Sequence, residues 1–395
     1  MRRITWFGRL GSLAAWLVAC DPNPTYTREI APLLAERCAG CHRTGGVAPM
    51  PLETFEDARA NAAAIASAVE SHRMPPWPPD QGDSCPPLEG DRRLPEDDVS
   101  LLSSWARGGT PRGNGSAEAT EGPSSPRWID DVSVTVAPPE PYNPEPSADT
   151  YRCFLLDPAL DHDAYLVAYA VGKAQGVHHL HVWSVDDDSQ LAKAEELDAA
   201  SPGGGWDCLD DVGIQARHLT VWGPTDPVRR HPDGTGMPLY AGKKLMMQIH
   251  YHHAREGGTY LDLQLADEVA HPADILTIGP APFILPPRTP ETTVQALTVT
   301  TKDGLLWGVR AHMHDLGSRA KISIVRKDGE ACLLSIPDWD AKWQLMYFFE
   351  APIPVASGDT LQIDCTYDTT SKTEETLNGP TASDEMCNAN FYVTW

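Results

Sequence analysis

The stretch WGVRAHMHDLG, residues 307–317, has the composition of a β-strand and carries His312 and His314 on either side of Met313. Side chains two positions apart in a strand project from the same face, so the two imidazoles are predicted to lie a few ångströms apart. This spacing suits chelation of a metal ion. An isolated His-x-His is more often a pair of ordinary histidines on a half-exposed sheet face, so the rest of the sequence has to decide between the two interpretations.

Similar strand-like runs recur through the C-terminal two thirds of the chain. They are DDVSVTV (130–136), DAYLVAYAV (163–171), HHLHVWSV (178–185), KLMMQIHYHH (244–253), LLWGVRAHM (305–313), AKISIVRK (320–327), DTLQIDCTY (359–367) and NANFYVTW (388–395). Together with 36 prolines and 31 glycines in the whole chain, they predict a mainly β protein with many short strands. The length of this region is better explained by two β-sandwiches, over residues 128–270 and 271–395, than by one.

The formal net charge of −24 excludes two classes of partner. Binding to nucleic acid, or electrostatic binding to anionic lipid, requires basic patches that neutralise phosphates. Acidity alone identifies no other partner.

The N-terminal segment MRRITWFGRLGSLAAWLVAC, residues 1–20, is typical of an export signal, because a basic start precedes a short apolar run. The run is too short for a transmembrane helix. Its last four residues resemble the bacterial lipobox, in which the cysteine is lipidated, so residues 1–19 are predicted to be a signal peptide and Cys20 a lipid anchor. The expected location is the periplasm or the cell surface. The alternative is an ordinary signal peptide with a chance cysteine.

The motif CAGCH, residues 38–42, has the C-x-x-C-H spacing of covalent c-type haem attachment. Cys38 and Cys41 would bond the haem vinyl groups, and His42 would ligate the iron. The second iron ligand is predicted to be Met74, in the rigid segment HRMPPWPP, with His72 and Met50 as the alternatives. A redox or zinc C-x-x-C followed by a chance histidine is the competing interpretation.

Helical patterns surround this motif. Apolar residues at helical spacing predict a helix before it and another after it, and LPEDDVSLLSSWARGG, residues 94–109, predicts a closing helix. The stretches GGVAPMPL (45–52) and MPPW (74–77) make residues 21–108 resemble the small cytochrome c domains that are fused to exported bacterial enzymes. Residues 109–127, rich in glycine, serine and proline, are predicted to be a flexible linker.

Histidines gather in the predicted strands. The groups are His178, His179 and His181; His250, His252 and His253; and His312 and His314. Metal binding is the simplest explanation, although imidazole suits zinc, copper and iron alike. Met386, in the segment TASDEMCNAN, adds a soft thioether that favours Cu(I). His181, His252 and His253 are interpreted as surface or supporting residues, with His252 a possible substitute for His250, and Met246 and Met247 as core residues.

The order His-His, QIHY, His-x-His and DEMCN over residues 128–395 resembles the copper type II, ascorbate-dependent monooxygenases, the family of the peptidylglycine and dopamine β-monooxygenases. The resemblance implies two jelly-roll-like sandwiches, each holding one copper. By position, His178, His179 and His250 would bind an electron-transfer copper. His312, His314 and Met386 would bind the copper that activates O2.

The resemblance also suggests substrate contacts and disulfides. Arg310 and Asn388 match positions that hold the substrate carboxylate in the peptidylglycine branch, whereas Asn390 replaces the expected tyrosine. Arg310 could instead pair with an acid such as Asp315. The implied disulfides are Cys153–Cys208 and Cys365–Cys387, which leaves Cys85 and Cys332 without a counterpart in the family.

The sequence therefore predicts an exported copper monooxygenase that hydroxylates an aliphatic C–H bond of a small or peptide-like substrate with O2. The fused haem would supply electrons to the first copper, beside or in place of ascorbate, and an external donor could reduce the haem. The main alternative is a non-catalytic lipoprotein for copper storage or electron transfer. A zinc hydrolase is disfavoured because no HExxH arrangement places an acidic base beside the histidines.

Overall fold

The computed structural model describes residues 24–395 apart from 45–47, 49, 81, 83, 115–128, 130, 141, 143–148, 173, 175–176, 202–203, 210–211, 224–227, 253–257 and 382. The predicted signal peptide, Cys20, His253 and most of the predicted linker lie outside these residues. None of the helices in the described ranges is long and apolar enough to cross a membrane.

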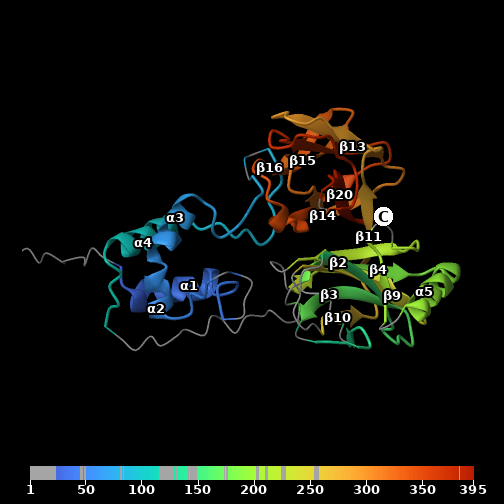
Figure 1. Cartoon of the computed structure of the whole chain (residues 1–395), viewed down its shortest axis with the longest axis horizontal. Helices are drawn as coiled ribbons and strands as arrows, with labels where there is room; N and C mark the ends of the chain where they lie inside the picture. Colours follow the sequence, from blue (N-terminus) through green and yellow to red (C-terminus); the bar gives the residue numbers. More distant parts are fainter. Residues whose placement is uncertain are drawn as a thin grey trace, which may run out of the picture.

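The N-terminal part is a small helical module (Figure 1). Its helices are η1 (Tyr26–Ile30), α1 (Ala31–Arg37), α2 (Phe55–Ala60), α3 (Ala62–Glu70) and α4 (Glu96–Arg107). Their apolar faces meet in one core, in which Trp105 and Leu102 are fully buried. The helices predicted on both sides of the CxxCH motif and at the end of the module are confirmed. The one after the motif is split at Asn61, and α2 begins with a capping box formed by Thr54 and Asp57.

The first sandwich follows. Its elements are β1 (Val134–Val136), β2 (Asp149–Leu156), β3 (Ala164–Gly172), β4 (Val177–Val185), α5 (Asp188–Ala200), β5 (Trp206–Asp207), β6 (Arg217–Trp222), β7 (Val228–Arg230), β8 (Thr235–Leu239), β9 (Lys244–His252) and β10 (Tyr260–Ala266). A five-stranded sheet, in the order β5-β2-β9-β4-β6, packs on a second sheet that contains β1, β10, β3 and β8.

The second sandwich is built in the same way. Its elements are β11 (His271–Ile278), β12 (Ile284–Leu285), β13 (Thr292–Val299), β14 (Gly304–His312), β15 (Gly317–Arg326), β16 (Gly329–Ile336), η2 (Ala341–Trp343), β17 (Tyr347–Val355), β18 (Thr360–Tyr367), β19 (Thr376–Leu377) and β20 (Asn388–Thr394). The sheet β13-β18-β15-β16 packs against β11-β20-β14-β17. The mainly β fold predicted from the sequence is confirmed.

One sheet runs through both sandwiches. Strand β8 pairs in parallel with β11, through Thr235 opposite His271 and Gly236 opposite Pro272. This short contact joins the β3 and β10 side of the first sandwich to the β20 and β14 side of the second, which makes a continuous nine-stranded sheet.

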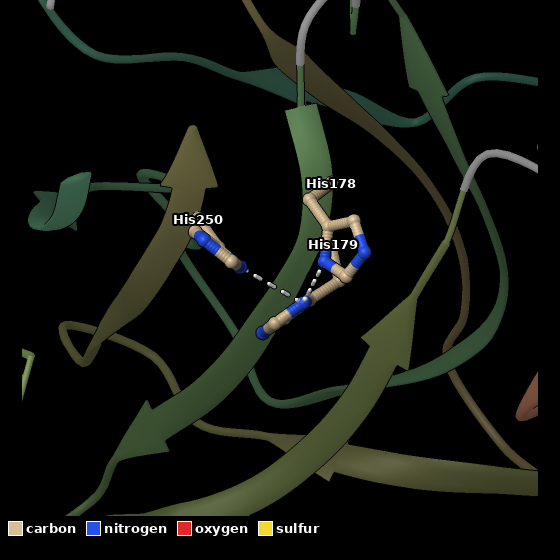
Figure 2. Close-up of side chains that lie close together, drawn as sticks. All are labelled: His178, His179 and His250. Atoms are coloured by element: carbon tan, nitrogen blue, oxygen red, sulfur yellow. Dashed lines mark hydrogen bonds between the residues drawn. The ribbon is translucent and has the colours of Figure 1, made fainter. Parts of the chain in front are cut away.

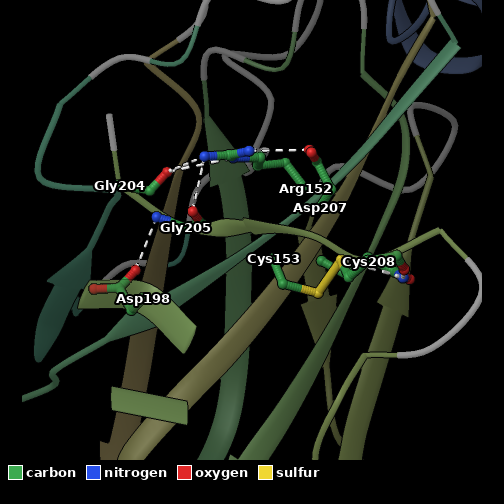
Figure 3. Close-up of polar contacts among 8 residues, drawn as sticks. Arg152, Cys153, Asp198, Gly204, Gly205, Asp207 and Cys208 are labelled. Carbon is green, nitrogen blue, oxygen red and sulfur yellow. Dashed lines mark hydrogen bonds and ion pairs between the residues drawn. A yellow bond between two sulfur atoms is a disulfide. The ribbon is translucent and has the colours of Figure 1, made fainter. Parts of the chain in front are cut away.

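The disulfides Cys153–Cys208 and Cys365–Cys387 are both present, and Cys85 pairs with Cys332. Around the first of these, Arg152 donates to Asp207 Oδ1 (2.9 Å) and to the carbonyl oxygens of Gly204 and Gly205 (Figure 3). This network fixes the turn before β5 and, through β2, the strand β9 that carries His250.

The segment between α3 and α4 connects the helical module to the second sandwich. We call residues 75–94 the strap. Figure 1 shows the chain leaving α3, reaching the second sandwich near β16 and returning to α4. Besides the Cys85–Cys332 disulfide, Leu88 forms a β-bridge with Phe349 of β17 and is only 4% exposed within the core of the second sandwich. The sequence analysis did not predict this contact.

Candidate metal centres

His178, His179 and His250 converge on the five-stranded sheet of the first sandwich (Figure 2). Adjacent residues in a regular strand point to opposite faces, but the pairing of β4 with β9 shifts register between Val177 and His179. This β-bulge turns His178 to the same side as His179. His250 lies opposite His179 on β9, so all three rings meet at one point.

The donor atoms of this cluster have the spacing of a metal site. Nδ1 of His179 is 3.0 Å from Nδ1 of His178 and 3.4 Å from Nδ1 of His250. With metal–nitrogen bonds of about 2.0 Å, such separations correspond to ligand–metal–ligand angles of about 95–115°, close to tetrahedral. Burial lowers the pKa of His179, and the neighbouring His250 and His178 lower it further. A neutral imidazole is the form that binds a metal.

A stacked tyrosine orients the buried member of this cluster. The rings of Tyr151 and His250 are parallel within 13°, with centroids 4.0 Å apart. Tyr151 stands opposite His250 on the neighbouring strand β2. His250 is 5% exposed and His178 is exposed, so the cluster opens toward solvent on the His178 side.

His312 and His314 lie at the end of β14, with ring centroids 5.2 Å apart. Nδ1 of His312 is hydrogen-bonded to the side-chain oxygen of Gln344, and Nδ1 of His314 lies 2.9 Å from the carbonyl oxygen of Asp384. Each acceptor holds a proton on Nδ1 and leaves the lone pair of Nε2 free for a metal. The sequence analysis missed Gln344, because no local motif links it to His312.

Met386 lies just before β20, the strand that pairs with β14. Strands β14 and β20 pair so that His312 stands opposite Asn388, and Asn388 Nδ2 is 3.8 Å from the Met386 sulfur. One carboxylate oxygen of Glu385 accepts from the backbone N–H groups of both His314 (2.9 Å) and Met386 (3.3 Å). The other accepts from Leu316 N–H at 2.8 Å. Glu385 therefore ties the backbone of Met386 to the backbone of His314.

Glu385 is a supporting residue that the sequence analysis did not identify. Its side chain is fully buried and links the loop after β14 to the loop before β20. Burial raises the pKa of its carboxyl, while the backbone N–H groups of His314 and Leu316 oppose that shift. The Tyr367 hydroxyl donates to the Met386 carbonyl oxygen at 2.7 Å, and the Cys365–Cys387 disulfide follows directly, so the methionine backbone is held on several sides.

Arg310 is bonded to protein groups other than the acid considered in the sequence analysis. Its guanidinium donates to the Gln344 carbonyl oxygen (3.0 Å) and to Asn390 Oδ1 (3.1 Å), and contacts Gln344 Oε1 at 3.5 Å. The side chain is 6% exposed, and burial lowers its pKa to about 10. Arg310 therefore orients Gln344, which in turn orients His312.

The boundary between the two sandwiches contains a pocket. It is lined from both sides, by His218, Tyr169 and Thr220 of the first sandwich and by Arg310, Asn390 and Tyr392 of the second, among others. Burial lowers the pKa of His218 to about 3, and the positive charge of Arg310 contributes to this shift.

His218 also contacts a histidine of the metal-bearing strand. His181 Nδ1 lies 3.3 Å from His218 Nε2 and its ring stacks on Trp183. His181 is thus a supporting residue, as interpreted from the sequence. Met246 and Met247 are fully buried core residues, also as predicted. The side chain of His252 is outside the description.

In the helical module, Cys38 and Cys41 are not joined to each other or to any other described cysteine. Burial raises the pKa of the Cys38 thiol to about 12. His42 Nδ1 lies 3.0 Å from the Met50 carbonyl oxygen, so its Nε2 is free to bind a metal. This contact involves the Met50 backbone.

Comparisons with known proteins agree with this geometry. Residues 272–395 match the family model of the copper type II ascorbate-dependent monooxygenase C-terminal domain. The peptidylglycine alpha-amidating monooxygenase of Rattus norvegicus is 26% identical over 70% of this chain, and that of Mus musculus is 25% identical over 63%. The chain spans only 28% and 25% of the length of these two relatives.

A solved structure of PNGF-II covers 66% of this chain and 65% of its own, at 10% identity and a TM-score of 0.27, which is too low to establish a shared fold. The similarities in sequence, in contrast, are to the two monooxygenases and to the copper-dependent family model. Residues 272–395, which hold His312, His314 and Met386, are accordingly similar to the C-terminal domain of the copper type II ascorbate-dependent monooxygenases.

Proposed function

We propose that the chain is a copper monooxygenase with two copper centres and a fused c-type haem. His178, His179 and His250 would hold the electron-transfer copper, and His312, His314 and Met386 the copper that meets O2. The substrate would be a small or peptide-like molecule that is hydroxylated at an aliphatic C–H bond. When bound, copper supplies one-electron redox chemistry and activation of O2.

The single observation that carries this proposal is the arrangement around Met386. Two imidazoles have their Nδ1 atoms already occupied, and the backbone N–H of Met386 is held by Glu385, so these three side chains would form a His2Met donor set. A thioether favours the reduced metal, and three protein ligands leave a coordination position open. Gln344 and Asp384 keep the two rings in the tautomer that binds metal through Nε2.

The residues of the helical module fit a covalent haem. The unpaired thiols of Cys38 and Cys41 stand beside His42, whose ring is already oriented by Met50. Met74 follows α3 and is proposed as the second iron ligand, with its backbone N–H donating to Ala68 at 3.2 Å. Electrons would come through this haem, with ascorbate as the other candidate reductant. We also propose export, with Cys20 as the lipid anchor.

Substrate contacts by Arg310 and Asn388 remain part of the proposal. The 3.8 Å distance between Asn388 Nδ2 and the Met386 sulfur supports such a role for Asn388. The bonds of Arg310 to Gln344 and Asn390 show what a substrate carboxylate would have to displace or share.

The proposal is tested by metal and haem analysis of the purified full chain, followed by substrate screening with an oxygen electrode. About two coppers and one haem per chain, and O2 uptake that depends on substrate and is abolished by Met386→Ile, are expected. Leu377→Ile, an exposed apolar change in the same sandwich, is the control that should leave uptake unchanged. Copper binding without any substrate-dependent O2 uptake would favour the alternative, a copper storage or electron-transfer protein.

A further inference from the structure

The strap places an aromatic side chain of the N-terminal module against the second sandwich, not far from His312. Trp77 packs edge-on against Tyr347 of β17, with ring centroids 5.4 Å apart. Tyr347 is 3% exposed, and Trp77 lies against the same core. Among the described residues, the buried indole N–H of Trp77 has no hydrogen-bond partner. The indole is therefore held by its packing against Tyr347, and not by a hydrogen bond.

From Tyr347 a short chain of contacts leads to the copper ligand. The Tyr347 hydroxyl donates to the Trp343 carbonyl oxygen at 3.1 Å. The next residue, Gln344, is hydrogen-bonded to Nδ1 of His312 through its side chain. The backbone of Tyr347 also stands opposite Val309 on β14, the strand that ends at His312. Two independent routes thus join the Tyr347 ring to one metal-binding imidazole.

On the other side, Trp77 is close in sequence to the proposed haem ligand. Only Pro75 and Pro76 separate it from Met74, and the three steps from Met74 to Trp77 span at most about 11 Å. The Met74 backbone is anchored on the end of α3, and the strap begins directly after it. Trp77, the first aromatic residue after Met74, is thus also the residue that packs against Tyr347 of the second sandwich.

The position of the module is fixed by more than this ring contact. Asp80 N–H donates to the Ser335 carbonyl oxygen (2.7 Å), and Glu89 N–H donates to the Phe348 carbonyl oxygen (2.8 Å). The Cys85–Cys332 disulfide closes the contact covalently. A module that is held in this way does not depend on diffusion at the end of a flexible linker to reach the sandwich.

We propose that Trp77 and Tyr347 form the electronic contact between the helical module and the second sandwich, so that electrons from the haem enter at the His312 site. This inference rests on the proposed function and changes one part of it, because the sequence analysis directed the haem electrons to the first copper. The step transfers one electron from ferrous haem, which becomes ferric, to Cu(II), which becomes Cu(I). No proton or atom moves with it.

The test uses full-length protein loaded with haem and copper, without O2 or substrate. The haem is reduced rapidly, and its reoxidation by Cu(II) is followed from the haem absorption bands. Trp77→Leu is expected to slow this transfer by about an order of magnitude or more, and Trp77→Phe, which keeps an aromatic ring, to restore most of it. Leu88→Ala, which removes strap packing without touching an aromatic ring, is the matched control and should leave the rate nearly unchanged.

A second pair of variants identifies the receiving copper. His178→Ala with His179→Ala should leave the fast haem reoxidation intact, whereas His312→Ala with His314→Ala should abolish it. The opposite result would overturn the inference and leave the proposed function standing. Equal rates in wild-type protein and Trp77→Leu would do the same. A purified chain without haem would instead contradict the proposed function itself, and with it this inference.

A docking measurement separates an electronic role from a merely structural one. The Cys85–Cys332 disulfide keeps the two parts linked in every variant, so docking is measured by amide hydrogen exchange of the Asp80 and Glu89 N–H groups, which donate to the Ser335 and Phe348 carbonyl oxygens. Both amides should be protected to the same extent in wild-type protein and in Trp77→Leu. Faster exchange in Trp77→Leu would attribute its slow transfer to lost docking and would overturn the electronic role.

Discussion

At the scale of single residues, the orientation of His312 depends on side chains outside the proposed ligand set. His312 is oriented by Gln344, and Gln344 is in turn held by Arg310 through its carbonyl oxygen. Such supporting partners fix the tautomer and the direction of a ligand ring. The chain His312, Gln344, Arg310 thus converts a flexible imidazole into a ligand that is already in place.

Gln344→Ala is therefore expected to weaken copper binding at the second centre by about 10- to 100-fold, with little change at the first. The measurement is a Cu(I) titration against a competing chelator. Gln362→Ala, which removes a side chain bonded only to the surface residue Asp364, is the control. Unchanged affinity in Gln344→Ala would show that His312 needs no such support.

Another single residue predicts how stability depends on pH. Burial lowers the pKa of His231 to about 4, whereas an unfolded histidine binds its proton near 6.5. The folded state therefore favours the neutral ring, and the free energy of unfolding should fall as the pH drops from 6.5 toward 4. Between pH 6.5 and 5, the His231→Gln variant should lose about 1–2 kcal/mol less unfolding free energy than the wild-type protein. Urea unfolding of the metal-free protein at several pH values measures it; identical slopes would contradict the assignment.

At the scale of elements, the cluster of His178, His179 and His250 depends on an irregularity in a strand. The strand β4 was predictable from its alternating apolar residues, and the bunched histidines made it a candidate for metal binding. The bulge between Val177 and His179 was not predictable, because it arises from pairing with β9, a partner some 70 residues away. The strap was missed for a similar reason: its short, proline-rich sequence carries no periodic pattern, and its position depends on contacts with β17.

The turn before β5 gives a test at this scale. Gly205 has a positive φ of 66°, and an added Cβ would lie 2.3 Å from the Cys153 carbonyl oxygen. Gly205→Ala should therefore lower the free energy of unfolding by clearly more than the ~1 kcal/mol that a left-handed conformation alone costs an L-residue. Gly242→Ala is the matched control, since its φ is 70° and nothing lies within 4 Å. Equal losses in the two variants, measured by thermal unfolding, would argue against the clash.

At the scale of the whole molecule, the three parts are mechanically connected. The nine-stranded sheet joins the two sandwiches, and the strap joins the helical module to the second one. The sequence located the module and the sandwiches from composition and periodicity, but the connections are long-range contacts that local patterns do not encode. The candidate metal ligands stand out in the sequence because histidine and methionine are rare and chemically specific, whereas Glu385 and Gln344 are common residues whose role would come from position.

Removing the longest cross-link should loosen this assembly. Cys85→Ser with Cys332→Ser opens a loop of 247 residues and is expected to cost about 2–4 kcal/mol of stability. Calorimetry should then show the helical module melting apart from the sandwiches, because the remaining strap contacts are few. Cys153→Ser with Cys208→Ser, which opens a loop of 55 residues inside one sandwich, should lower stability without separating the transitions. A single transition in the first variant would show that the noncovalent strap contacts suffice.

The position of the strap also sets an order of assembly during biosynthesis. Leu88 and Cys85 belong to the part of the chain that is made early, but their seat is built from Cys332 and Phe349, which are made near the end. The Leu88 side chain and the Cys85 thiol therefore stay exposed while more than half of the polypeptide is translated. During that interval Cys85 can pair with the wrong cysteine, such as Cys153 or Cys208. Production of the intact molecule consequently calls for a disulfide isomerase. Omitting the isomerase from the host should lower the yield of the wild-type protein more than the yield of a variant that lacks Cys85 and Cys332.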